Sequence, residues 1–396
     1  MKRVFIINAH WNNRGDEAAL RSLIDRLIQD DINISIQFQS SRVDQFPYSF
    51  IPYMEEYPRL RQIPDFILGA ITKGKLGSKQ FKHFYSELIS ADLVLHAPGG
   101  PSIGDIYYKK EPTYIIKLLA AKLYGIPYIF CAPSAGPFKK KNMNIFRRYI
   151  YNNAERIIFR EDISQDYYKE LKCKESIVTC DLALRNEINI ERQEEKLNVD
   201  YSLVKFFNKY EKIVGITITD LRWHPKFSGD IEVINRITSS FTELIEVLKK
   251  KGYGVMFIPQ QFGMASDCQY MQGFSRDNCF MLNNDYDCYL QQFVIGRLFA
   301  VVGMRYHSNI FSAKMGTPFI SVSYEQKMKG FVKKIDYSDY CIDIEALSSQ
   351  ELIGKFLRLE KHYDELKMLL ETKVIELKKL SNITTEIIID YLKGND

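Results

Sequence analysis

The sequence lacks the features that mark secreted, zinc-binding and membrane-spanning proteins. Its seven cysteines are scattered without a Cys-x-x-Cys pair, so they predict neither a disulfide framework nor a zinc site. This usage favours a reducing, cytoplasmic location. No apolar run is long enough to span a bilayer, and the short apolar start predicts a first strand and no signal peptide. We therefore expect any membrane contact to be peripheral.

Charge and catalytic motifs are also sparse. The formal net charge is only +5 over 396 residues, whereas a dedicated nucleic-acid binder is usually more basic. The lysine runs at 139–141 and 249–251 are expected at helix ends, or else give a weak attraction to anionic lipid or substrate. There is no H-E-x-x-H or P-loop motif and no evident cluster of metal ligands, so we expect no metal.

Short apolar runs alternate with helix-like segments along most of the chain, which predicts parallel sheets covered by helices, an α/β fold. The polar segment 185–212 interrupts this rhythm, and we interpret it as a linker. The strand-like and helix-like stretches before and after it are 4–7, 17–28, 92–97, 113–124, 126–132, 144–153, 156–159, 213–218, 231–251, 254–259, 299–303 and 318–322.

The rhythm predicts two doubly wound, Rossmann-like domains at 1–190 and 191–348, with a helical segment at 349–396. One interpretation of the last helix is that it packs back on the first domain. A coiled-coil partner site is the alternative, although the apolar repeat holds for few heptads. The oligomeric state does not follow from the sequence.

Ligands of open parallel sheets bind beyond the carboxyl ends of the strands, so residues that follow strand-like runs are candidates. After the first run, Gly15 and Asp16 come just before a helix. In a structural interpretation, Asp16 caps the helix and Gly15 permits a sharp turn. In the other, the helix N-terminus and Arg14 face a cleft between the domains and bind a ligand.

Two loops of small residues follow later strand-like runs. In HAPGGPSIGD, Gly99 and Gly100 would let the backbone approach a ligand closely, although glycine-rich loops are common. CAPSAGPF holds the same kind of position and contains Ser134. We take Gly99, Gly100 and Ser134 as candidate substrate-binding residues.

Two polar side chains follow other strand-like runs. Arg160 follows the run at 156–159 and either binds an anion or pairs with Asp162. Gln260 follows the run at 254–259 and could hydrogen-bond a hydroxylated ligand.

The segment GMRYHSNIFSAKMGTPFISVSYEQK carries the strongest pattern. Arg305 offers a planar fork suited to phosphate or carboxylate, and His307 can donate or accept a proton near neutral pH. Lys327 follows the next strand and could reach the same anion. Charges on surface loops are the alternative, but the spacing favours an anion pocket with a proton-transfer group beside it.

Seven segments occur in a recognisable order: NNRGDEAAL, PGGPSIGD, SAGPF, FREDIS, CDLAL, PQQ and MRYHSNIFSAKMGTPFISVSYEQKMKGF. In this order the chain resembles the polysaccharide pyruvyl transferases over residues 5–331, most specifically in the last segment. Two loops depart from the family pattern. Pro98 stands where a third consecutive glycine is common, and APSAGP replaces a more glycine-rich loop.

The resemblance implies a GT-B-like pair of Rossmann-type domains with the site between them, the first on the acceptor side and the second on the donor side. It implies transfer of a pyruvyl group from phosphoenolpyruvate to a sugar of a bacterial surface polysaccharide, such as an exopolysaccharide or capsule, or of its lipid-linked precursor. A ketal forms and phosphate is released. His307 would act as acid or base, and Arg305 and Lys327 would hold phosphate and carboxylate. The donor is a substrate, so no cofactor is expected.

Two other functions remain open at this point. A nucleotide-sugar glycosyltransferase would share the architecture, because fold alone does not separate activities. A non-catalytic glycan-binding subunit would bind saccharide and release no phosphate.

Overall fold

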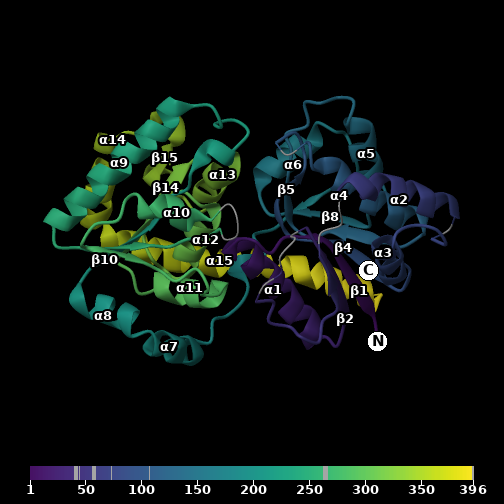
Figure 1. Ribbon diagram of the computed structural model, residues 1–396, viewed down its shortest axis with the longest axis horizontal. Coiled ribbons are helices and arrows are strands. Elements are labelled where there is room, and N and C mark those ends of the chain that lie inside the picture. Colours follow the sequence, from purple (N-terminus) through teal and green to yellow (C-terminus); the bar gives the residue numbers. More distant parts are fainter. Residues whose placement is uncertain are drawn as a thin grey trace. The chain divides into compact units, whose positions relative to one another are not determined.

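The computed structural model describes residues 1–39, 43, 45–55, 59–72, 74–106, 108–261 and 266–394. The chain divides into two compact units, both visible in Figure 1. The first unit consists of Met1–Asn12, Asp16–Arg185 and Lys378–Asp396. The second consists of Asn13–Gly15 and Asn186–Leu377. Both are α/β structures built on parallel strands, as the alternation in the sequence predicts.

In the described part of the first unit, seven parallel strands form a sheet in the order β3-β2-β1-β4-β6-β8-β9. The strand order reverses beside β1, so the sheet is doubly wound. The strands are β1 (Arg3–Ala9), β2 (Asn33–Phe38), β3 (Tyr53–Met54), β4 (Leu93–His96), β6 (Tyr128–Phe130), β8 (Arg156–Phe159) and β9 (Ile177–Val178), with β5 (Gly99–Ile103) and β7 (Pro133–Ala135) paired separately. The helices are α1 (Arg14–Gln29), α2 (Arg59–Thr72), α3 (Lys79–Ile89), α4 (Glu111–Leu123), α5 (Asn144–Asn152), α6 (Asp162–Lys169) and η1 (Leu182–Leu184).

Side chains of β1 alternate between two cores, because successive residues of a strand point to opposite faces. Phe5 and Ile7 pack in the core covered by α2 to α6. Val4 and Ile6 pack in the core covered by α1 and by the last turns of the final helix. Burial on both faces explains why the strands of this sheet read as continuous apolar runs.

The second unit repeats this plan. Within its described residues, six parallel strands take the order β12-β11-β10-β13-β14-β15, and the order reverses beside β10. The strands are β10 (Ile213–Thr217), β11 (Gly254–Phe257), β12 (Cys279–Met281), β13 (Ala300–Gly303), β14 (Phe319–Ser323) and β15 (Cys341–Asp343). The helices are α7 (Ile190–Val199), α8 (Tyr201–Lys209), η2 (Leu221–Trp223), α9 (Ile231–Lys250), α10 (Asp267–Gln272), α11 (Cys288–Ile295), α12 (Tyr306–Lys314), α13 (Gln326–Lys334), η4 (Ser338–Tyr340), η5 (Ile344–Ala346) and α14 (Ser349–Lys361).

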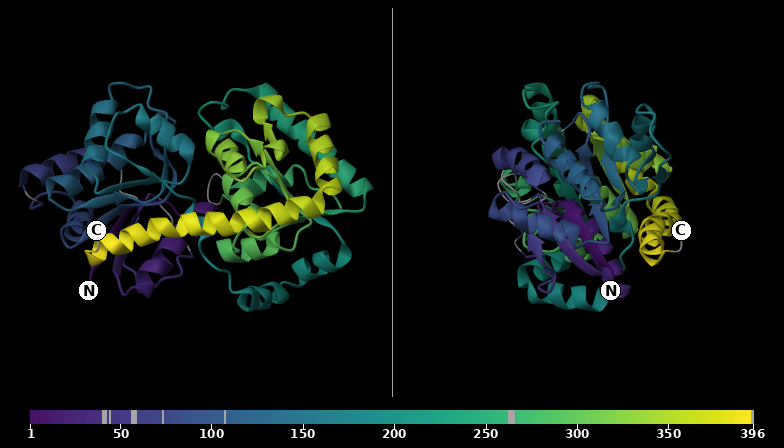
Figure 2. Two further views of the ribbon diagram at one scale, coloured as in Figure 1. Left: turned by 180° about the vertical axis from the view of Figure 1, so that it is seen from behind. Right: turned by 90° about the vertical axis from the view of Figure 1, so that its right-hand side faces the viewer.

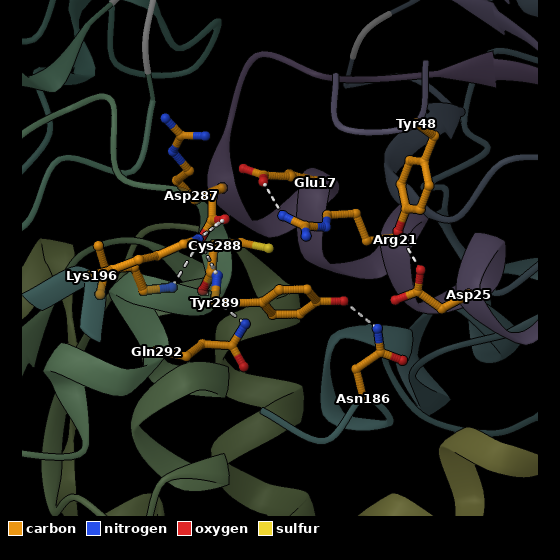
Figure 3. A network of polar contacts seen from close by, with 12 residues as sticks. Glu17, Arg21, Asp25, Tyr48, Asn186, Lys196, Asp287, Cys288, Tyr289 and Gln292 are labelled. Atoms are coloured by element: carbon orange, nitrogen blue, oxygen red, sulfur yellow. Dashed lines mark hydrogen bonds and ion pairs between the residues drawn. The ribbon is translucent and has the colours of Figure 1, made fainter. Parts of the chain in front are cut away.

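The linker expected at 185–212 is wrong, because α7 and α8 occupy most of it. Asn189 and Asp200 cap the two helices with their side-chain oxygens. The ammonium of Lys196 lies 3.0 Å from Asp287, which caps α11 (Figure 3). The Nδ2 group of Asn186 donates a hydrogen bond to the Tyr289 hydroxyl (Figure 3). The polar composition therefore reflects helices that bury only a narrow apolar face.

The final helix, α15 (Tyr363–Lys393), is continuous over 31 residues (Figure 2). Its residues up to Leu377 belong to the second unit, and those from Lys378 onward belong to the first. In the first unit, Ser381 donates to the backbone carbonyl of Asp181 at 3.0 Å, and Ile388 is fully buried. The helix is thus part of the core of each unit.

Two expectations about absences can be compared with the structure. Among the described residues, no helix combines the length and the apolar character that a membrane crossing requires. The seven cysteines all lie within the described ranges and form no disulfide bond.

Candidate active site

The candidate residues of the second unit gather at one edge of its sheet. Thr217 pairs with Gly303 in the register of β10 and β13, and Gly303 pairs with Ser321 in that of β13 and β14. The chain segments that leave these strands therefore begin side by side at the carboxyl edge, next to the reversal of strand order. Ligands of doubly wound sheets bind in this place.

The first turn of α12 presents Arg305 and His307. Arg305 has extended backbone angles and is the N-cap residue of the helix, so His307 lies in its first turn. The Ser308 hydroxyl holds the turn, since it donates to the Arg305 carbonyl at 2.7 Å and lies 2.9 Å from the hydroxyl of Thr217. Gly303 leaves no room for a side chain, because a Cβ there would lie 2.6 Å from the Ser308 hydroxyl. This packing directs a positive helix end toward the edge of the sheet.

Arg305 is paired with a buried carboxylate that the sequence did not reveal. Its Nε lies 3.2 Å from Asp267, and its Nη2 donates to the other oxygen of the same group. Burial by itself would lower the pKa of Arg305, but Asp267 and Tyr324 outweigh this and raise it. The guanidinium carbon also lies 5.6 Å from the ring centre of Trp223. Arg305 is therefore a fixed cation.

Asp267 also binds the backbone that follows β11, at Gln260. One oxygen of its carboxylate accepts the backbone N–H groups of Gln260 and Gln261 at 3.1 and 2.9 Å. The side chain of Gln260 is buried, and its Nε2 donates to Gln291 at 3.0 Å. Gln260 thus braces the loop after β11 through its backbone and its amide, and its role in binding a hydroxylated ligand stays a prediction.

Lys327 lies in the first turn of α13 and has its own carboxylate partner. Its ammonium is 2.6 Å from Glu325 and 5.7 Å from the ring centre of Tyr306. The other oxygen of Glu325 lies 3.3 Å from Nε2 of His224, whose Nδ1 accepts the N–H of Lys226. Burial would raise the pKa of Glu325, but Lys327 and His224 outweigh burial and lower it to about 2. The ring of Tyr306 in turn lies 5.0 Å from that of His307, so Lys327 lies near the start of α12.

A segment from the N-terminal region completes this edge. Asn13 forms an antiparallel bridge with Gln261, and the backbone N–H of Arg14 donates to the carbonyl of Gln260 at 2.9 Å. The buried guanidinium of Arg14 donates to the carbonyl of Asn284 at 2.5 Å. Arg14 is therefore held in place by backbone carbonyls of the second unit.

Gly15 packs directly against the ring of His307. A Cβ built on Gly15 would overlap Cγ and Nδ1 of the imidazole, so only glycine fits under this ring. The expectation that Gly15 and Asp16 precede the helix is wrong, because α1 already begins at Arg14. Gly15 is thus required by close packing and not by a sharp turn, and Asp16 lies in the first turn, where a carboxylate is favourable.

A pocket of about 620 Å³ opens beside the Arg305 pair. Its wall includes Asp267 and Trp223, both of which contact the guanidinium. The remaining residues that line it are Thr219, Asp220, Arg222, Thr238, Ser266, Gln269, Tyr270, Gly273 and Phe274. Aromatic rings and hydroxyl groups are therefore present together next to the fixed cation.

The candidate residues of the first unit form a separate group. Gly99 has a φ of +137°, and a Cβ there would lie 3.0 Å from the carboxylate of Asp16, so this position needs glycine. Gly100 has open space around its α-carbon, with nothing within 4 Å of a built Cβ. The loop that follows β4 therefore passes close to the start of α1 within the first unit.

Arg160, which follows β8, lies next to Ser134 of β7. The Nε of Arg160 donates to the Ser134 hydroxyl at 2.8 Å, and its Nη1 donates to Asp181 at 2.7 Å. Glu161 lies 3.2 Å from the same guanidinium. The sequence suggested Asp162 as the ion partner of Arg160, whereas these carboxylates come from Glu161 and from Asp181, 21 residues further on. The side chain is almost fully buried, so its charge is balanced within the unit.

Comparisons with known proteins address the family. The family model for polysaccharide pyruvyl transferase matches residues 13–326. The chain belongs to the polysaccharide pyruvyl transferase family. One curated relative is the amylovoran biosynthesis protein AmsJ of Erwinia amylovora, 23% identical over 434 aligned residues that cover all of both chains. The chain is thus similar throughout its length to a protein of polysaccharide biosynthesis.

Solved structures with little sequence identity share the fold. HepE of Anabaena in complex with UDP-glucose has a TM-score of 0.62 at 11% identity, with all of both chains covered. A glycosyltransferase of Rickettsia africae has a TM-score of 0.63 at 12% identity, covering 99% of this chain and 98% of that one. The UDP-GlcNAc 2-epimerase of Neisseria meningitidis has a TM-score of 0.58 at 12% identity, covering 98% and 100%. The chain therefore has the GT-B type of fold, as expected.

Proposed function

We propose that this pyruvyl transferase moves the pyruvyl group of phosphoenolpyruvate to a sugar of a bacterial surface polysaccharide or of its lipid-linked precursor, forming a ketal and releasing phosphate. Family membership supports the transferred group, and the similarity to AmsJ supports a polysaccharide pathway. The observation that carries the proposal is the first turn of α12, where a helix N-terminus, Arg305 and His307 occur together near Lys327. An acid with two anionic groups suits such a place.

In the proposed reaction, protonated His307 gives its proton to the methylene carbon of phosphoenolpyruvate, which becomes a methyl group. The neighbouring carbon, which bears the phosphate oxygen, becomes electron-poor. A sugar hydroxyl attacks this carbon and passes its proton to the now neutral His307, which restores the starting state. The carbon–oxygen bond to phosphate then breaks, a second hydroxyl closes the ring, and phosphate takes up the second hydroxyl proton.

The two cations hold the donor in this proposal. A guanidinium has five N–H donors and an ammonium has three, so the pairs with Asp267 and Glu325 leave donors for the carboxylate and phosphate of the substrate. The carboxylates also fix the direction of each cation before the substrate binds, and preorganised donors of this kind stabilise developing charge. The proposal uses no metal and no cofactor, and we place the reaction in the cytoplasm.

Phosphate release measured with the purified protein, phosphoenolpyruvate and candidate lipid-linked saccharides tests this function, together with mass spectrometry of the acceptor. We expect phosphate release that requires acceptor, and a mass gain equal to one pyruvyl ketal. His307→Ala and Arg305→Ala should each lower kcat by about 10²–10³-fold while the fold survives.

Other results would overturn the proposal. Activity that requires a nucleotide sugar would indicate a glycosyltransferase, and saccharide binding without phosphate release would indicate a glycan-binding subunit. Near-normal turnover in both folded variants would refute the roles given to His307 and Arg305.

A further inference from the structure

Helix α2 of the first unit has an apolar face that points outward. Ile63, Ile67 and Ile71 follow one another at intervals of four residues and are 44, 54 and 76% exposed. Leu68 on the same side is 40% exposed, and Leu76 in the following turn is 53% exposed. Residues four apart share one face of a helix, so these side chains form a continuous apolar strip, which we call the α2 strip.

The opposite side of α2 already has its packing partners. Phe66 is buried, with ring centres 5.2 Å from that of Phe81 and 5.1 Å from that of Phe84. A Cβ at Gly69 would overlap the ring of Phe81, so the helix lies tightly on α3. The other side of α2 makes the contacts with the core of the first unit. The α2 strip is therefore not needed for that core and stays exposed.

Exposed lysines follow the α2 strip in the chain. Lys75, Lys79 and Lys82 are exposed in the turn and helix that follow. From residue 59 to residue 82, the sequence contains six lysines and arginines and one acidic residue, Asp65. Apolar side chains flanked by lysines are the pattern that binds an anionic bilayer surface, with the apolar groups in the headgroup region and the cations at lipid phosphates.

We propose that the α2 strip docks the first unit on the surface of a membrane that contains anionic lipid. The proposed function supplies a reason, since a lipid-linked acceptor lies at such a surface, but the binding itself depends only on the α2 strip and on the lysines of the turn and helix that follow it. An apolar patch on a monomer commonly marks an interaction site. The excess of cations favours anionic lipid over a second copy of this chain, which carries the same positive charge at this face.

Vesicle flotation of the full-length protein tests the docking, with vesicles of phosphatidylcholine alone or mixed with phosphatidylglycerol. We expect the protein to float with the mixed vesicles, less so at high salt. The double variant Ile67→Glu, Ile71→Glu should reduce the bound fraction by about tenfold or more. Lys75→Gln combined with Lys79→Gln should weaken binding and its dependence on salt.

A matched control comes from the second unit. Val199 and Ile231 are 78 and 73% exposed, and Val199→Glu combined with Ile231→Glu adds the same charge without touching α2. This control should float like the unchanged protein. Circular dichroism and melting temperature should be alike in all variants, because the six substituted side chains are exposed.

Other results of flotation and sedimentation would count against the docking. Failure of the unchanged protein to float, or equal flotation of the α2 double variant, would overturn it. A sedimentation shift from dimer to monomer in that variant, with flotation unchanged, would assign the α2 strip to a second copy. Phosphate release with a detergent-soluble acceptor separates the two proposals: if it fails while flotation persists, the proposed function is wrong and the docking stands.

Discussion

Gly15 and His307 contact each other although they lie far apart in the sequence, and this contact leads to the first prediction at the residue scale. Gly15→Ala should destabilise the protein by about 1–3 kcal/mol, because the added methyl overlaps the imidazole. It should also lower kcat by moving the ring. Urea unfolding and steady-state phosphate release measure the two effects.

Two further variants distinguish the steric overlap at Gly15 from the general effect of replacing a helical glycine by alanine. Gly354 lies in α14 with nothing within 4 Å of a built Cβ, so Gly354→Ala should stabilise by up to about 1 kcal/mol. Gly15→Ala combined with His307→Ala removes the ring that the methyl meets. The double variant should recover most of the lost stability without activity, and additive losses would show that the contact is not the cause.

Glu325 gives the protein a predicted pH dependence. Its folded pKa of about 2 lies below its ordinary value of 4.5, chiefly because Lys327 and His224 offset burial. A lowered folded pKa means that the stabilisation is complete above pH 4.5 and is lost as the pH falls toward 2. The loss should be on the order of 3 kcal/mol.

Free energies of unfolding measured between pH 6 and pH 2.5 check this dependence. Glu325→Gln should be less stable at pH 6, and its difference from the unchanged protein should shrink as the pH falls. A constant difference across this range would contradict the lowered pKa.

The residues of the candidate site were only partly predictable. Arg305, His307 and Lys327 follow strand-like runs, so strand order alone places Arg305 and Lys327 at neighbouring strand ends. Asp267 and Glu325 were missed as their partners. Asp267 lies 38 residues before Arg305 and follows no strand directly, so its contact with the guanidinium is visible only in the folded structure.

At the scale of elements, apolar periodicity predicted the longer central strands of both sheets and the helices α1, α4, α5 and α9 to within a few residues. It failed at 185–212, since α7 and α8 bury few apolar side chains, among them Leu197, Leu203 and Phe206. The N-caps Asn189 and Asp200 were the available signals, because an Asn or Asp immediately before the first helical residue is typical of a helix start. The many charged residues of this segment favoured a linker instead.

The loop between β5 and α4 is held by a buried ion network centred on Arg147 of α5. Its guanidinium donates twice to Glu111, at 2.7 and 2.8 Å, and once to Asp105 at 2.7 Å. Glu111 also accepts the backbone N–H of Gly104 at 2.9 Å. The network therefore connects α4 and α5 to the glycine loop that carries Gly99.

Arg147→Lys should destabilise the protein by about 3–5 kcal/mol, because a lysine cannot make the paired contacts and leaves buried carboxylate unpaired. Amide hydrogen exchange at Gly104 should become faster. Arg148 is exposed and donates to the carbonyl of Leu171, so Arg148→Lys should cost less than about 1 kcal/mol. Equal effects of the two changes would mean that the network does not hold the loop.

At the scale of the whole molecule, α15 supplies core residues to both units. Leu370 is buried in the part that belongs to the second unit, and Ile388 is buried in the part that belongs to the first. The second part also supports a candidate residue, since Ser381 donates to the carbonyl of Asp181, whose carboxylate holds Arg160. Each unit is thus incomplete without a segment of the same helix.

Ile388→Ala should therefore lower the stability of the first unit by about 2–5 kcal/mol, the usual cost of a cavity in a core. Ile375 on the same helix is 59% exposed, and Ile375→Ala should change stability by less than about 0.5 kcal/mol. Hydrogen exchange during urea unfolding distinguishes the units: in Ile388→Ala, β1 and β4 should lose protection at lower urea than β10 and β13. If all four strands lose protection together at a lower urea concentration, the two units unfold as one cooperative structure. In that case α15 transmits the loss of a core residue in one unit to the other.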